Sequence, residues 1–290
     1  INTEWQGKVA TQEINVQEGW SFISSYLAPA NPVIDEIFTE PVIEGDLIFA
    51  FNKGGVFWPG QNVNTMDFWW TKQALKVKAA NDFTMEMPGV VYADKTVLLE
   101  TGYNYMPVLS EEPVNAADIF NQLGDDLHFA FDIGQGLVYW PAGGLYTLTT
   151  LEPGSGYFVN TFGECVADFG NIAKSAIAQN NTSINAPHNY KSTGIQHLWA
   201  IDKEALTGIP EGSVLAVGNK DGRIVSSAMI TDASEPMLLI AHGDDPTTKT
   251  VEGFVAGDKM EISMVDAETL EISTLIPEFD TGIGMEDVYA

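Results

Sequence analysis

The chain has 290 residues, 45% of them hydrophobic, and its 40 Asp and Glu outnumber its 13 Lys and Arg, which gives a formal net charge of -27. The 7 Trp, 15 Phe and 9 Tyr exclude a disordered chain, because disordered segments contain few aromatic residues. The negative electrostatic field of such a chain repels phosphate groups, so nucleic acid and anionic membrane surfaces are excluded as partners. No apolar run approaches the roughly 20 residues of a spanning helix, and we expect no membrane insertion.

The same acidity is typical of proteins outside the cell, in salty settings where charge repulsion is screened, and of chains that bind divalent cations. Cys165 is the single cysteine, so the fold cannot contain an internal disulfide. The sequence begins at Ile1 with no initiator Met and no basic or apolar leader. We therefore expect an extracellular or cell-surface chain whose signal peptide has been removed, or a fragment of a longer protein.

Residues 19–60 and 102–142 carry the same pattern. The first segment contains GWSFISSYL, DEIF and LIFAFNKGGVFWPG, and the second contains GYNYMPVL, ADIF and LHFAFDIGQGLVYWPA. The GW and GY pairs lie 83 residues apart, and the IF pairs and the FWP and YWP blocks lie 82 apart. The same spacing of 82 extends to ALKV and GYFV, which begin at Ala74 and Gly156. Because chance would not keep one register across four separate blocks, the sequence predicts a tandem duplication.

Each repeat predicts the same order of elements. In the first repeat, alternation over residues 20–25 indicates a strand, and the apolar spacing of residues 32–38 indicates a short amphipathic helix. An apolar run interrupted by two glycines indicates a hairpin over residues 47–58. A closing pair of strands is expected near residues 75–78 and 83–87.

The composition of the chain changes after the second repeat. Residues 171–192 contain the polar run Asn180-Asn181-Thr182-Ser183 and Pro187, and they form the expected linker. Beyond them, short strands separated by polar turns are expected at residues 214–218, 224–230, 237–241, 254–256, 259–265 and 270–275. Such spacing predicts a β-sandwich.

The expected fold class is therefore mainly β. Two tandem small β-rich (α+β) repeat modules, at residues 1–92 and 93–170, are followed by a β-sandwich domain at residues 193–290, which includes a C-terminal tail. The linker at residues 171–192 separates the two parts.

These motifs resemble a module of secreted and cell-surface proteins of the Bacteroidetes, in which a GWN-IS-Y…IF…YWP pattern recurs in tandem. Residues 212–264, which include GSVLAVGNKDGRIVSSAMI and LLIAHGDDPTTKTVEGFVAGDKMEISM, are similar to the β-sandwich segment that accompanies it. The resemblance covers about nine-tenths of the chain. It implies export by the type IX secretion route with a cleaved C-terminal sorting domain, for which the residues before Ala290 give no clear pattern. The resemblance indicates the location and the class of the protein better than it indicates a ligand.

Catalytic signatures are missing from the sequence: it contains no HExxH, GxSxG, CxxC or P-loop motif, and its four histidines have no ligand spacing. A pair of acids in a cleft, as in a glycosidase, leaves no mark in a sequence. Abundant carboxylates alone do not indicate one, so we expect a protein that is not an enzyme.

Two oxygen-rich turns are candidate calcium sites. One contains Asp244 and Asp245, and the other contains Asn219 and Asp221. Calcium takes six to eight oxygen ligands, which such loops supply, although neither loop matches an EF-hand. The alternative is ordinary turn chemistry, because Asp and Asn cap their own backbone. Calcium is the one candidate cofactor.

Several aromatic residues are candidates for a contact surface that stacks on sugar rings. Trp58 and Trp140 occupy equivalent positions on hairpin strands, which favours a place in the core. Trp69 and Trp70 have no aromatic counterpart in the second repeat. Since neighbouring strand residues point to opposite faces, we expect one of this pair to be exposed, and the pair is the candidate ligand-binding site.

Three functions remain open. The first is a non-enzymatic secreted or cell-surface module for adhesion or ligand binding. The second is a structural subunit of an extracellular filament or matrix, assembled through strand edges or termini. The third is the carbohydrate-binding part of a secreted polysaccharide-degrading enzyme. The corresponding partners are other surface proteins, further copies of the chain, or glycans.

Overall fold

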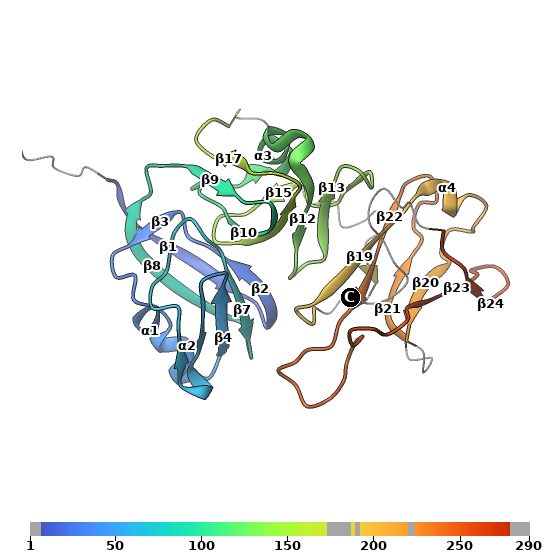
Figure 1. The fold of residues 1–290 in the computed structure, drawn as a ribbon, viewed down its shortest axis with the longest axis horizontal. Coiled ribbons are helices and arrows are strands. Elements are labelled where there is room, and N and C mark those ends of the chain that lie inside the picture. Colours follow the sequence, from blue (N-terminus) through green and yellow to red (C-terminus); the bar gives the residue numbers. More distant parts are fainter. Residues whose placement is uncertain (1–6, 173–186, 189–191, 220–223, 279–290) are drawn as a thin grey trace, which may run out of the picture. The chain divides into compact units, whose positions relative to one another are not determined.

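The computed structural model describes residues 7–172, 187–188, 192–219 and 224–278 (Figure 1). The structure is mainly β, as the sequence predicts, with 47% strand, 11% helix and several antiparallel sheets. The chain divides into two compact units. The first contains Ile1–Gly134 and Leu148–Asn180, and the second contains Gln135–Thr147 and Asn181–Ala290.

The first repeat contributes two antiparallel sheets and two short helices to the first unit. The larger sheet has the order β2-β7-β4-β5-β6 and the smaller one the order β1-β8-β3. The elements are β1 (Val9–Val16), β2 (Gly19–Ile23), β3 (Leu27–Pro29), α1 (Ile34–Ile37), α2 (Thr39–Glu44), β4 (Leu47–Asn52), β5 (Gly55–Trp58), the 3-10 turn η1 (Pro59–Gln61), β6 (Val63–Asn64), β7 (Leu75–Ala79) and β8 (Phe83–Val91).

The second repeat contributes the rest of the first unit. Here β10, β16 and β12 lie side by side in that order, and β11 pairs with β15 and β9 with β17. The elements are β9 (Thr96–Leu99), β10 (Gly102–Pro107), β11 (Val114–Asn115), α3 (Ala116–Phe120), the 3-10 turn η2 (Asn121–Asp126), β12 (Leu127–Asp132), β15 (Thr150–Leu151), β16 (Gly156–Thr161) and β17 (Cys165–Asp168).

Alternation along the strands separates core from surface. In β7, Leu75 and Val77 are buried in a core that also contains Ile34 and Phe38, while Lys76 lies on the opposite face of the sheet. A period of two in the sequence produces this division because successive side chains of a strand point to opposite faces.

The two repeats share details of hydrogen bonding. The pairing of β4 with β7 shifts register between Leu47 and Phe49, and the pairing of β12 with β16 shifts at the equivalent place, between Leu127 and Phe129. The entry to the helix is also the same. Ile34 N–H donates to the carbonyl of Asp67 over 2.9 Å, and Ala116 N–H, 82 residues later, donates to that of Thr149 over 2.9 Å. The duplicated sequence thus gives a duplicated backbone.

The hairpin that follows is repeated as well, as β5–β6 and as β13 (Leu137–Trp140) with β14 (Leu145–Tyr146). In the first copy, Val56 N–H donates to Oγ1 of Thr65 over 3.0 Å. In the second copy, Val138 N–H donates to Oγ1 of Thr147 over 2.9 Å. One threonine therefore closes each hairpin in the same way.

Equivalent residues of the two repeats face each other within the first unit. Phe22 and Tyr105 are equivalent, and their ring centroids lie 4.8 Å apart. Ala74 and Gly156 are also equivalent, and a Cβ added to Gly156 would lie 2.4 Å from that of Ala74. In a two-fold interface, residues on the axis meet their own counterparts, so these contacts indicate a local two-fold relation between the repeats.

The second unit contains two sheets that enclose their own apolar core, as a β-sandwich requires. The larger sheet has the order β18-β21-β20-β23-β24, and β19 pairs with β22. Besides β13 and β14, the elements are β18 (Pro187–His188), β19 (Gln196–Ile201), α4 (Lys203–Leu206), β20 (Val214–Gly218), β21 (Ile224–Met229), β22 (Met237–His242), β23 (Glu261–Val265) and β24 (Ile272–Leu275).

Three details of the sequence prediction are wrong. β7 and β8 do not pair with each other: both edges of β7 are occupied by β2 and β4, and β8 pairs with β1 and β3. Residues 254–256 form no strand, because a turn starts at Val255, whose carbonyl accepts from Asp258 N–H over 2.9 Å. Pro187–His188, inside the expected linker, forms β18 against β21, and β19 was not expected at all.

We expect Gly156→Ala to destabilise the first unit by about 1–3 kcal/mol, because the new methyl group would overlap the Cβ of Ala74. The double variant Ala74→Gly with Gly156→Ala exchanges the two residues and should recover most of the loss. Urea unfolding of the wild type and of the two variants measures both effects. A double variant no more stable than Gly156→Ala would contradict the direct contact.

Candidate functional site

A pocket of about 210 Å³ opens in the first unit, where the β4–β5 turn meets the segment before β7. Two of its lining groups are apolar, the thioether of Met66 and the indole of Trp70, and two are primary amides. The lining residues are Asn52, Gly54, Met66, Trp70 and Gln73. An apolar surface with a few fixed polar groups is the usual composition of a small-molecule site.

Asn52 is the fixed polar group of this pocket. It ends β4 with 8% of its surface exposed, and its Oδ1 accepts from the backbone N–H of Gly54 over 2.8 Å and of Gly55 over 3.0 Å. Two donors on one atom identify that atom as the amide oxygen, so Nδ2 is left as a donor. Nδ2 has no partner among the described residues, so a molecule in the pocket can accept a hydrogen bond from it.

Trp70 and Trp69 have opposite environments. Trp70 is 62% exposed and lines the pocket. Trp69 is 2% exposed and belongs to the core, where its ring centroid lies 6.2 Å from that of Phe38. The prediction of Trp69 as a ligand contact is thus wrong. The backbone N–H of Trp69 donates to the carbonyl of Pro32 over 2.7 Å, and this bond holds the chain so that the indole faces inward. The expectation that one of the pair is exposed is confirmed.

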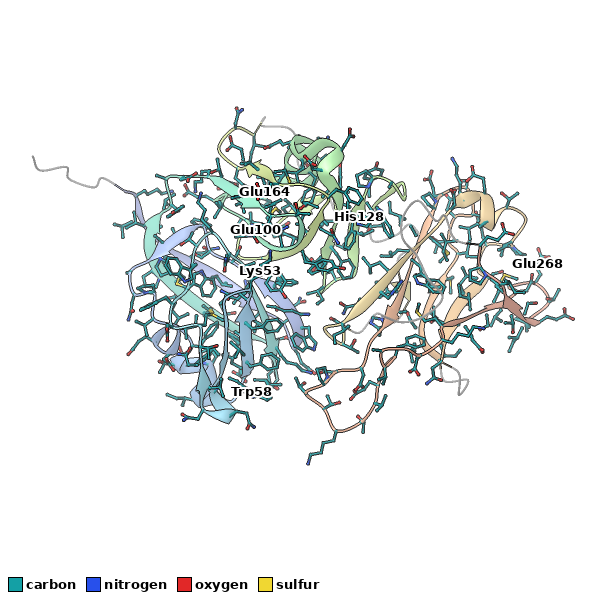
Figure 2. The ribbon with its side chains drawn as sticks, viewed as in Figure 1. Lys53, Trp58, Glu100, His128, Glu164 and Glu268 are labelled. Atoms are coloured by element: carbon teal, nitrogen blue, oxygen red, sulfur yellow. The ribbon has the colours of Figure 1, made fainter. Side chains whose placement is uncertain are left out.

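The β4–β5 turn is also held by the second repeat. Lys53 and Glu100 are labelled in Figure 2, and the Nζ of Lys53 lies 3.1 Å from Oε2 of Glu100. The same Nζ lies 3.3 Å from Oδ1 of Asn104. The ion pair is exposed and contributes little by itself. Asn104 is buried and donates from Nδ2 to the carbonyl of Glu100 over 2.7 Å, so this anchor is rigid. The second repeat therefore fixes the turn that carries Asn52.

The corresponding turn of the second repeat, between β12 and β13, is two residues longer and lacks the site. Asp132 occupies the place of Asn52, and its Oδ1 accepts from Gly134 N–H over 2.9 Å. Glu152 stands 82 residues after Trp70, so no indole is present there. Burial raises the pKa of Glu152. The two repeats share the strands on either side of the turn, but of the two only the first has the amide donor and the aromatic surface.

The other aromatic candidates serve the fold. Trp140 is buried, as expected. Trp58, labelled in Figure 2, is half-buried. Its ring centroid lies 5.3 Å from that of Phe49. On the same face, Nζ of Lys76 lies 4.8 Å from the ring centroid of Trp20, within the range of a cation–π interaction. These contacts hold side chains to one another on the face of the sheet opposite α1.

Asp244 and Asp245 make the bonds of a turn. Oδ1 of Asp245 accepts from the backbone N–H of Thr247 over 2.9 Å and from its hydroxyl over 2.6 Å. Oδ1 of Asp244 accepts from Glu252 N–H over 2.9 Å. Both carboxylates therefore stabilise the loop that follows β22, which is the turn chemistry named as the alternative to calcium.

Only the first residue of the second candidate metal loop belongs to the described part of the chain. Asn219 follows β20, and Asp221 lies outside the described residues. Within the described part of the chain, no three side chains of His, Cys, Asp or Glu gather in a way that could hold a metal ion. Calcium binding stays a prediction.

Comparison with family models, with curated proteins and with solved structures finds no match for this chain. In the described residues, no helix has the length and apolar character needed to cross a bilayer. The site must therefore be interpreted from its own chemistry.

Sequence reasoning found Trp70 but missed the amides of Asn52 and Gln73. The Asn-Lys-Gly-Gly string does indicate an Asx-type turn, which would have located Asn52 at the end of a strand. The fold alone shows that Nδ2 of Asn52 has no hydrogen-bond partner among the described residues, and that Gln73 lines the same pocket.

Alanine substitution should separate the two tryptophans. We expect Trp69→Ala to destabilise the first unit by about 3–5 kcal/mol, because it empties a filled core position. Trp70→Ala should change stability by less than about 0.5 kcal/mol, since its indole is mostly exposed. Chemical denaturation of both variants gives the comparison, and equal losses would contradict the assignment of Trp70 to the surface.

Proposed function

We propose that the chain is a non-enzymatic secreted or cell-surface module for adhesion, which binds its ligand at the pocket formed by Asn52, Met66, Trp70 and Gln73. The observation that carries this proposal is an exposed indole beside a buried amide whose donor is unused. Exposed aromatic rings with fixed hydrogen-bond donors are typical of recognition sites.

The chemistry of the lining supports binding over catalysis. An indole, a thioether, two amides and a glycine surround the pocket, and none of them supplies a general acid, a general base or an activated nucleophile. The net charge of -27 supports a place outside the cell, where salt screens repulsion between acidic surfaces. Export by the type IX route and calcium binding are further parts of this proposal.

Adhesion can be measured with beads coated with the full chain and incubated with intact bacterial and animal cells. We expect Trp70→Ala to lower the bound fraction at least tenfold, because the largest exposed surface of the site is lost. Tyr103→Ala is the matched control: Tyr103 is 60% exposed, lies on β10 and does not line the pocket. Trp70→Ala beads that adhere like wild type, or wild-type beads that bind no surface, would contradict the proposal.

One observation favours a second function, assembly into a filament or matrix. β24 is the last strand in the order of its sheet, and no other strand of the described residues pairs with its outer edge. Ile272 on this strand is 75% exposed and Ile276 just after it is 92% exposed. An apolar strand edge of this kind accepts a strand from another chain.

Light scattering across protein concentration tests the second function. If copies join through β24, the mass should rise with concentration, and Ile272→Lys should abolish the rise because a charge on an edge strand opposes pairing. Val9→Lys is the control, since Val9 is exposed on the edge strand β1 of another sheet. A constant monomer mass at all concentrations would exclude assembly through β24.

A further inference from the structure

The chemistry of the pocket also restricts the class of its ligand, on the basis of the proposed function. Trp70 offers a flat apolar ring, and Met66 adds a buried apolar contact beside it. Such a surface suits a ligand with a flat apolar face, because the energy comes from removing apolar area from water.

The polar groups of the pocket require acceptors on that same ligand. Nδ2 of Asn52 is a donor of fixed direction, because its amide oxygen is held by two backbone N–H groups. Gln73, exposed at the rim, has an amide that can both donate and accept. A ligand with hydroxyl groups around an apolar ring satisfies both amides while it stacks on the indole.

The charges of the site favour a neutral ligand. No charged side chain lines the pocket, and the nearby Lys53 is already paired with Glu100. The chain as a whole carries a net charge of -27, which repels carboxylates and sulfates. A carboxylate in the pocket would gain no cationic partner, and its desolvation would not be offset.

The size of the pocket limits what enters it. Its volume of about 210 Å³ is below the roughly 300–1,000 Å³ of sites for drug-sized ligands. This volume suits a single ring, with the rest of a longer ligand outside. A proline-rich peptide would need a groove lined by several aromatic residues, and here one aromatic residue lines the pocket.

We infer that the Trp70 pocket binds one neutral sugar ring of a glycan, stacked on the indole and hydrogen-bonded to the amides of Asn52 and Gln73. The second repeat has Asp132 and Glu152 at the equivalent positions of Asn52 and Trp70, which removes both the donor and the stacking surface. Of the two repeats, only the first therefore has such a site.

The second repeat also supplies the best variant for a test. Asp132 ends β12 as Asn52 ends β4, and its carboxylate accepts from a backbone N–H of the turn that follows. A carboxylate can therefore replace the amide oxygen, so Asn52→Asp keeps an acceptor for the backbone N–H groups while it removes the donor and adds a negative charge. The substitution should leave the melting temperature unchanged and still weaken binding. A weaker affinity at an unchanged melting temperature would show that the amide of Asn52 acts in recognition and not in folding.

Calorimetric titration of the full chain with gluco-, manno- and galacto-oligosaccharides of four to six units tests the inference. We expect at least one of these series to bind with one site per chain. Trp70→Ala and Asn52→Asp should each lower the affinity at least tenfold, while Tyr103→Ala leaves it unchanged. The loss of one hydrogen bond of ordinary strength lowers an affinity by about tenfold.

The comparison ligands are the uronate oligosaccharides of matching length and a proline-rich peptide. Tighter binding of a uronate, Trp70-dependent binding of the peptide, or two sites per chain would overturn the inference. If no neutral series binds while Trp70-dependent adhesion to cells persists, the sugar inference fails and the proposed function stands. If Trp70→Ala changes neither binding nor adhesion, both fail.

Discussion

The contact between Ala74 and Gly156 constrains the whole first unit. These residues lie where the central strands β7 and β16 begin, and there is no room for a second methyl group between them. Ala74 N–H also donates to the carbonyl of Tyr105 over 3.1 Å, so backbone and side chains meet at one point. Gln73 directly precedes this junction, and the pocket takes its position from it.

A second consequence of duplication is that equivalent strand ends carry two different chemistries. The ends of β4 and β12 each need a side-chain oxygen that accepts from a backbone N–H of the following turn, and Asn52 and Asp132 provide it. The other terminal atom of the side chain, a nitrogen in Asn52 and an oxygen in Asp132, can therefore differ without destabilising the turn. In the first repeat it is an amide donor beside an indole, whereas in the second it is a carboxylate oxygen.

Much of the fold follows from local sequence, and the exceptions have physical reasons. Alternation and glycine turns located β2, β4, β5 and β20 because those signals act within a few residues. The separation of β7 from β8 depends on which edges are already occupied, which is a property of the whole sheet. For the site, an aromatic pair without a counterpart in the other repeat was visible in the sequence. The spare donor of Asn52 was not, because it depends on which amide atom the turn uses.

The local two-fold relation has a consequence for the ancestry of the chain. Because Phe22 meets Tyr105 and Ala74 meets Gly156, each repeat presents to the other the surface that it would present to a copy of itself. Such self-complementarity is the property of a homodimer whose subunits have been joined by gene fusion. Two repeats joined in one chain do not have to remain identical, and here Asn52 and Trp70 of the first correspond to Asp132 and Glu152 of the second.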